Sequence, residues 1–184
     1  MKKFFLVLLV FLIVGGSAFA FDILSYPPPL TGGNVMVDAG IGLTFYGSRI
    51  GKVSIPPIFL NVEYALNGKV PISVGGFAAY YRYNYRVVGD SGWQYGFFTL
   101  GGRANWHWGF DVSWLDFYCG TWIGYRIFNA NWVGTSHGYI APHYGGFDFG
   151  LQVGSHFYFS NKFGMVLESG YPFALKVGAA WKFN

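Results

Sequence analysis

Apolar and polar residues alternate along most of the chain. The clearest example is 173–183, where the odd positions are Phe, Leu, Val, Ala, Trp and Phe and the even positions are Ala, Lys, Gly, Ala and Lys. A period of two is the signature of a β-strand whose two faces meet different surroundings. Aromatic residues and frequent Gly also favour strands and turns over helices.

The alternation predicts eight strands, near residues 34–46, 58–66, 71–85, 94–108, 115–128, 144–159, 163–169 and 172–183. This spacing fits membrane-crossing strands of roughly 9–11 residues joined by turns. We expect compact turns at 67–69, 109–114 and 160–162, on the periplasmic side together with both chain ends. The connections at 47–57, 86–93, 129–143 and 169–172 are expected on the outer side.

Two architectures place one apolar and one polar face on every strand. A soluble sandwich or lipocalin buries the apolar face, whereas a membrane barrel turns it outward to lipid. The chain is only 11% charged, against about 25% in typical soluble domains, and its polar face is rich in Gly, which suits a narrow interior. The sequence therefore predicts an all-β, transmembrane, antiparallel up-and-down barrel of eight strands, and an exported soluble β-protein stays as the alternative.

Aromatic residues gather near the predicted strand ends, as the girdles of a membrane barrel do. One rim would carry Trp106, Trp108, Trp114, Phe159, Phe163, Trp181 and Phe183, and the other Tyr80, Phe147, Tyr171 and Phe173.

The first twenty residues differ from the rest. A positive start (Met1–Lys3), an unbroken apolar run over 4–14 and small residues at 18 and 20 predict a secretory signal peptide at 1–20, which leaves 21–184 as the barrel. Removing Lys2 and Lys3 lowers the formal charge from +4 to +2, and the chain has no basic run, so we expect no nucleic-acid partner. The single Cys119 excludes an intramolecular disulfide and is expected to face lipid.

The polar faces would line the interior of the barrel and form a network of opposite charges. An eight-stranded interior is just wide enough for side chains to fill it, and unpaired buried ions are costly, so these groups should pair and plug the lumen. The predicted members are Asp38, Glu63, Arg103, Asp116, Arg126, Asp148, His156, Glu168, Lys176 and Lys182, with His107 beside them. Arg82 is expected to point outward near a strand end.

Three stretches resemble a known group of proteins. They are GGRANWHW at 101–108 followed by LDFYCG at 115–120, GSHFYFSNKFG at 154–164, and KVGAAWKF at 176–183. Together they are similar to small OmpA/OmpX-like outer-membrane β-barrels. The resemblance implies a bacterial outer-membrane location and a monomer inserted by the barrel-assembly machinery. The chain departs from the group at its end, because such barrels usually finish with an aromatic residue and here Phe183 is followed by Asn184.

Function is less constrained than fold. We expect an integral outer-membrane protein with a structural or surface-interaction role, in contact with membrane lipid and with lipopolysaccharide or another surface ligand. A narrow channel for ions or small solutes is the alternative, and a lipid A-modifying enzyme is a third hypothesis.

The enzyme hypothesis needs Ser, His and a carboxylate near the outer rim. Ser136–His137, His143 and Asp90–Ser91 fall in predicted outer loops, whereas Ser155–His156 lies toward the periplasmic half. Their spacing implies no rigid catalytic scaffold, so we expect no enzyme activity. His137 and His143 are the outer-loop candidates for metal binding, at a spacing too weak to predict a site, and no cofactor is expected.

Overall fold

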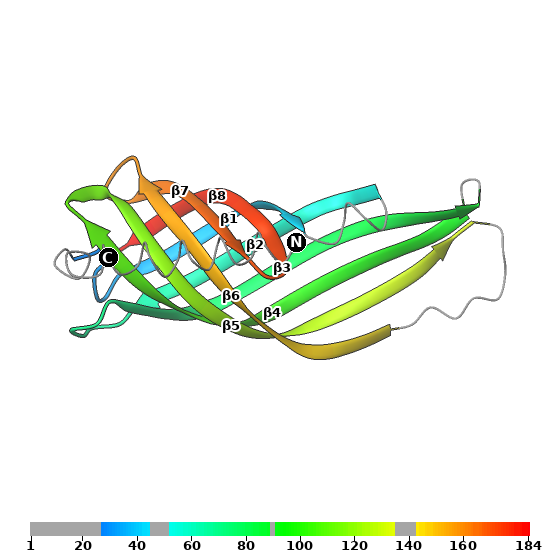
Figure 1. Cartoon of the computed structure of the whole chain (residues 1–184), viewed down its shortest axis with the longest axis horizontal. Helices are drawn as coiled ribbons and strands as arrows, with labels where there is room; N and C mark the ends of the chain where they lie inside the picture. The colour runs from blue at the N-terminus through cyan, green and yellow to red at the C-terminus, as the bar shows by residue number, and fades with distance from the viewer. Residues whose placement is uncertain (1–26, 45–51, 89–90, 135–142) are drawn as a thin grey trace, which may run out of the picture.

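The computed structural model describes residues 27–44, 52–88, 91–134 and 143–184. Within them the chain forms the strands β1 (Val35–Thr44), β2 (Lys52–Ala65), β3 (Ile72–Val88), β4 (Ser91–Phe110), β5 (Val112–Val133), β6 (His143–Tyr158), β7 (Phe163–Gly170) and β8 (Phe173–Phe183). Each strand pairs antiparallel with its neighbours in sequence, and β1 pairs with β8, which closes the barrel (Figure 1). The predicted eight-stranded up-and-down barrel is confirmed. No helix in these ranges is long and apolar enough to cross a membrane.

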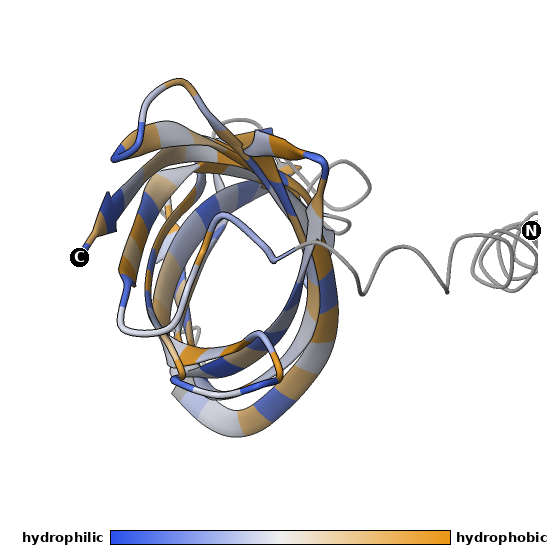
Figure 2. Cartoon of the chain, turned by 90° about the vertical axis from the view of Figure 1, so that its left-hand side faces the viewer, coloured by the Kyte–Doolittle hydropathy of each residue, from blue (hydrophilic) through white to orange (hydrophobic). Residues whose placement is uncertain are grey.

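The closed part of the barrel is apolar outside and polar inside. Phe147, Phe149 and Leu151 point outward and are 84%, 76% and 74% exposed. Asp38, Asp116 and His156 point inward and have no exposed surface. Seen along the barrel, hydrophilic and hydrophobic residues alternate around a closed ring (Figure 2). This is the reverse of a water-soluble barrel, in which the apolar face is buried.

Aromatic side chains surround the end of the barrel that carries the β2–β3, β4–β5 and β6–β7 turns, which we call the turn end. Trp108 packs against Trp106 and Phe117 with tilted rings, at centroid distances of 5.0 and 5.4 Å. Phe163 lies 5.8 Å from Trp181 in the same way. These outward rings occupy the places expected for one girdle.

The opposite end is not closed. A curved sheet, which we call the extension, projects beyond β7 and β8 (Figure 1). It consists of residues 81–88 of β3, 91–97 of β4, 128–133 of β5 and 143–146 of β6. Strands β3, β4 and β5 are 17, 20 and 22 residues long, well above the roughly 9–11 residues that cross a bilayer.

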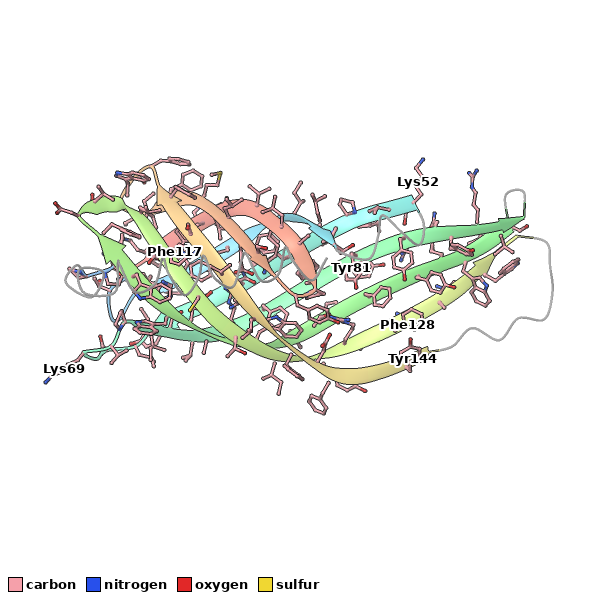
Figure 3. The ribbon with its side chains drawn as sticks, viewed as in Figure 1. Lys52, Lys69, Tyr81, Phe117, Phe128 and Tyr144 are labelled. Carbon is pink, nitrogen blue, oxygen red and sulfur yellow. The ribbon has the colours of Figure 1, made fainter. Side chains whose placement is uncertain are left out.

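The inward and outward faces of the sheet exchange polarity where the extension begins. Its inward side chains include aromatic rings that pack on one another: Tyr81, Tyr83, Tyr95, Phe97 and Phe128. Its outward side chains include the polar residues Arg82, Asn84, Gln94, Asn129 and Asn131. Figure 3 shows Tyr81, Phe128 and Tyr144 along this sheet, with Lys69 at the far turn end. The extension thus has the polarity of a sheet surrounded by water.

This exchange explains why the outer connections were predicted too long. The loops were predicted at 47–57, 86–93 and 129–143. The prediction is wrong over the parts that belong to strands, which are residues 52–57, 86–88, 91–93, 129–133 and His143. The strands were predicted from an apolar outward face. In the extension the outward face is polar, so the alternation has the opposite phase. The β4–β5 turn is tighter than the predicted 109–114, because β4 ends at Phe110 and β5 begins at Val112.

Phe173 was predicted on the outward face, and this is wrong. The ring is only 4% exposed and meets Tyr81 edge-to-face at 6.0 Å inside the barrel. The β7–β8 register shifts between the Glu168–Lys176 and Gly170–Phe173 pairs. Such an irregularity inserts one extra residue and reverses the alternation of side chains beyond it, which turns Phe173 inward.

Glycine closes the seam between β1 and β8. Gly40 pairs with Gly178, and a Cβ atom on Gly40 would lie 2.2 Å from the Val177 carbonyl oxygen and 2.4 Å from the Gly178 Cα atom. Both obstacles are backbone atoms, so no side chain fits without moving a strand. By contrast, a Cβ atom on the outward-facing Gly76 would meet its nearest atom, the Gly101 carbonyl oxygen, at 3.5 Å.

Candidate functional site

Arg103 on β4 lies in the polar interior and bridges two carboxylates that come from two other strands, β2 and β7. Its Nε atom lies 2.8 Å from Glu63 Oε1 on β2, and its terminal nitrogen lies 2.6 Å from Glu168 Oε2 on β7. Glu168 is also paired with Lys176 and accepts a hydrogen bond of 2.7 Å from the Tyr118 hydroxyl. The Arg103 and Glu168 side chains are each 1% exposed, so water does not screen this cluster.

A second cluster lies nearer the turn end and contains two histidines. Asp116 on β5 accepts from His107 Nδ1 at 3.0 Å and from His156 Nδ1 at 3.1 Å. His156 Nε2 then reaches the Asp38 carboxylate at 3.3 Å. These side chains come from β1, β4, β5 and β6 and are buried.

Hydrogen-bond partners fix the charge of the His156 imidazole. A neutral imidazole has one donor nitrogen, but both nitrogens of His156 face carboxylates, which accept. The His156 ring is therefore an imidazolium cation. His107 Nδ1 faces the Asp116 carboxylate, and its Nε2 lies 2.9 Å from Ser73 Oγ.

Each buried acidic side chain of these clusters faces a basic one. The acidic side chains are Asp38, Glu63, Asp116 and Glu168, and the basic ones are Arg103, Lys176, His107 and His156. Pairing of this kind matters because a buried ion without its partner costs several kcal/mol, on the order of 3–5.

The end of this interior away from the turn end is covered by the β7–β8 turn. Trp122 Nε1 donates to the Tyr171 carbonyl oxygen at 2.8 Å, and the two rings lie parallel. Arg126 pairs with Asp148 and lies over the Tyr171 ring at 5.6 Å. The cavity under this cover is about 10 Å³. That is roughly the space one water molecule occupies.

The turn end is filled by the segment before β1. Pro28 and Leu30 are buried against the barrel, and Leu30 is 3% exposed. Lys182 was predicted to pair with the lumen acids, but its ammonium group donates to the Pro29 carbonyl oxygen at 3.0 Å and lies over the Tyr158 ring. A hydrogen bond of 3.1 Å from Asn34 to Asn184 ties this segment to the last residue.

Of the predicted lumen residues, the structure thus brings together Asp38, Glu63, Arg103, Asp116, His156, Glu168 and Lys176, and it places the Arg126–Asp148 pair above them. Sequence reasoning missed Ser73 and Asn105, which donate to Glu63, and Tyr118 as a donor to Glu168. Their inward phase was visible from the alternation, but the contacts depend on register.

One contact pattern has the geometry of a hydrolase triad. Ser73 Oγ lies 2.9 Å from His107 Nε2, and His107 Nδ1 lies 3.0 Å from Asp116. Ser73 donates its proton to Glu63, however, and its side chain has no exposed surface, so no substrate reaches it.

The outer catalytic and metal candidates are placed only in part. Asp90, Ser136 and His137 lie outside the described residues, and for His143 only the backbone, the first residue of β6, is described. Ser155 and His156 point to opposite sides of the wall. Among the described residues no three His, Cys, Asp or Glu side chains are arranged to hold a metal ion.

Known proteins resemble the chain in structure. No protein-family model and no curated protein matches the sequence. The crystal structure of Ail, the attachment invasion locus protein of Yersinia pestis, aligns with a TM-score of 0.58 at 13% identity, over 83% of this chain and all of Ail. Ail has also been solved in complex with the heparin analogue sucrose octasulfate, and that structure aligns with a TM-score of 0.57 at 12% identity, over the same shares.

Two further barrels align over similar lengths. The N-terminal β-barrel domain of Pseudomonas aeruginosa OprF gives a TM-score of 0.52 at 14% identity, over 83% of this chain and 98% of that one. Neisserial surface protein A gives 0.51 at 12% identity, over 81% and 94%. The resemblance to small OmpA/OmpX-like barrels is confirmed at the level of the fold.

Proposed function

We propose that this chain is an integral protein of a bacterial outer membrane, with a sealed interior and a role exercised at its outer surface. In this proposal the outward apolar face of the closed barrel contacts lipid and the extension projects into the medium. The signal peptide at 1–20, insertion by the barrel-assembly machinery and a monomeric state belong to the same proposal.

The distribution of charge on the outward face supports the membrane location. From the turn end up to Tyr80, the outward positions of the described strands carry no Asp, Glu, Lys or Arg, and Arg82 is the first on β3. A charge facing the bilayer midplane costs about 2–4 kcal/mol, whereas a soluble surface of this area would carry many charges.

The paired, buried charge network is the observation that carries the sealed interior. An ion passing Arg103 would have to break contacts of 2.6 and 2.8 Å to two carboxylates whose side chains are each 1% exposed. Trp122 and Tyr171 cover one end of the interior, and the buried Leu30 fills the turn end. A side-chain-filled lumen leaves the outer surface as the place where the protein meets its partners.

The same arrangement supports a non-catalytic surface role. The Ser73–His107–Asp116 contacts are sealed from substrate, so they support structure instead of hydrolysis. Contact with lipopolysaccharide or another surface ligand fits the long extension. Binding of a sulfated sugar by Ail, a protein of the same fold, is consistent with that role.

The decisive test is conductance of the refolded chain in a planar bilayer, after a heat-sensitive gel shift has shown that the barrel is folded. We expect no steady conductance, and resistance of the native protein to carbonate extraction from membranes. Steady conductance that changes with Arg103→Ala or Glu168→Ala would replace the sealed interior with the narrow channel. Release by carbonate would overturn the membrane location.

A further inference from the structure

We propose that Asn67 is a site of spontaneous modification, at which the side-chain amide is lost as ammonia and an isoaspartyl link forms in the backbone, and that this change loosens the segment filling the turn end. We call this segment, residues 28–34, the plug. The reaction needs neither the membrane location nor the sealed interior of the proposed function.

Asn67 and Gly68 belong to the β2–β3 turn and are exposed; Lys69 marks this turn in Figure 3. Asn is among the thermolabile residue types. It reacts when the backbone nitrogen of the following residue attacks its side-chain amide, and a side chain on that residue hinders the attack. Gly68 has none, and beyond its two chain neighbours a Cβ atom there would meet nothing closer than 3.9 Å. The attacking nitrogen is therefore uncrowded.

The backbone hydrogen bonds of the turn leave the Gly68 amide unused. Leu66 N donates to the Ile72 carbonyl oxygen at 2.8 Å, and Ile72 N donates to the Val70 carbonyl oxygen at 2.9 Å. Among the described residues, no backbone hydrogen bond takes the N–H of Gly68. An amide that is not held in this way can turn toward the Asn67 side chain, and the permissive backbone of Gly helps it to do so.

The reaction balances with water as the only reagent. Hydroxide or water removes the Gly68 amide proton, and the nitrogen forms a bond to Asn67 Cγ. The bond from Cγ to the side-chain nitrogen breaks, and that nitrogen takes a proton from water and leaves as ammonia. Water then opens the cyclic succinimide. Cleavage at Cγ gives aspartate, whereas cleavage at the main-chain carbonyl carbon gives the isoaspartyl link.

Asn67 is in contact with the plug. A Cβ atom on Gly32 would lie 2.5 Å from Asn67 Oδ1 and 3.0 Å from Asn67 Cα, so the two segments pack with no space between them. Gly33 N donates to the Ala65 carbonyl oxygen at 2.9 Å, and Ala65 N donates to the Asn34 carbonyl oxygen at 2.9 Å. The plug is thus held to β2 just before Asn67.

An isoaspartyl link changes both the length and the charge of this contact. It inserts the Cβ atom of residue 67 into the main chain and replaces a neutral amide with a carboxylate. Because there is no space between Asn67 and Gly32, the longer turn has to move against the plug. We expect the hydrogen bonds at Ala65 to break and Leu30, which is buried in the intact protein, to leave the turn end.

The first test is the modification itself. The refolded chain is incubated in phospholipid nanodiscs, which leave both ends of the barrel in water, at neutral and at mildly alkaline pH. Deamidation is located by peptide mass spectrometry, and isoaspartate by labelling with protein isoaspartyl methyltransferase. We expect isoaspartate at Asn67, formed faster at alkaline pH, and none at Asn161 over the same time. Asn161 is the internal control, because it is exposed in the β6–β7 turn of the same end but is followed by Lys162.

Gly68→Ala is the matched variant. Its Cβ atom has space and the φ angle of Gly68 is not positive, so the variant should fold with the heat-sensitive gel shift of the wild type. The added methyl group hinders the attacking nitrogen, so most of the deamidation at Asn67 should be lost. Absence of isoaspartate at Asn67, equal amounts at Asn161, or an unchanged rate in Gly68→Ala would overturn the modification site.

The second test is the state of the plug. Chymotrypsin cleaves after Leu, so cleavage at Leu30 is compared in fresh and in aged protein. We expect Leu30 to be protected in fresh protein and in aged Gly68→Ala, and to be cleaved in the aged wild type. Cleavage that does not increase as isoaspartate accumulates at Asn67 would overturn the loosening of the plug and leave the modification site standing.

Discussion

Replacing Arg103 with Met tests how much the central ion cluster stabilises the barrel. Met keeps much of the volume but removes the cation shared by Glu63 and Glu168, whose side chains are each 1% exposed. Glu168 keeps its ion pair with Lys176 and its hydrogen bond from Tyr118, so it loses one of two permanent cations. Glu63 keeps its hydrogen bonds from Ser73 and Asn105 but loses its ion pair with a permanent cation. Removing one partner of a buried pair costs about 3–5 kcal/mol, and we expect that loss.

The assay is equilibrium urea unfolding in phospholipid vesicles, followed by tryptophan fluorescence and by the heat-sensitive gel shift. Arg126→Met is the matched control: its side chain and that of Asp148 are 17% and 21% exposed, so water screens them and the loss should be about 1–2 kcal/mol. Adding Glu63→Gln to Arg103→Met should restore part of the stability, because Glu63 is the carboxylate that loses its permanent cation, whereas Glu168 keeps Lys176. Equal losses for both Arg variants, or no rescue, would refute the reasoning.

Three other predictions are simpler. Gly40→Ala should prevent closure and abolish the heat-sensitive band, because its Cβ atom would lie 2.2 Å from the Val177 carbonyl oxygen, whereas Gly76→Ala should fold normally. Trp122→Ala should destabilise the barrel by about 3–5 kcal/mol in urea unfolding, through the lost ring and hydrogen bond; a smaller loss than in a surface Trp variant would contradict this. Cys119 faces outward, so a membrane-permeant maleimide should label it and a sulfonated one should not.

The sequence predicted most of the closed barrel because each strand there separates lipid-like from polar surroundings. The inward phase of Asp116, for example, follows from its neighbours alone. Its partner His156 could not be predicted, because their contact depends on β5 and β6 pairing residue for residue, and the two lie 40 positions apart.

The extension could not be predicted for a different reason. In residues 128–133, the aromatic side chains point inward and Asn129 and Asn131 outward, the opposite of the rest of β5. A search that assumes one surrounding for the whole strand interprets this reversal as the end of the strand. The prediction that Phe173 points outward was wrong for a similar reason, because a register shift of one residue leaves no mark in the apolar–polar alternation of the sequence.

The tie between Asn34 and Asn184 joins residues 150 positions apart, at the seam where β1 meets β8. Contacts between residues so distant in sequence form late, because the chain loses conformational entropy in closing the loop before the contact contributes any stabilising energy. Leu30 and Pro29 stand directly before this seam and contact the interior only once it has closed. Seating of this segment therefore reports completed assembly: its protection from a protease should appear last in a refolding time course, after the hairpins are formed.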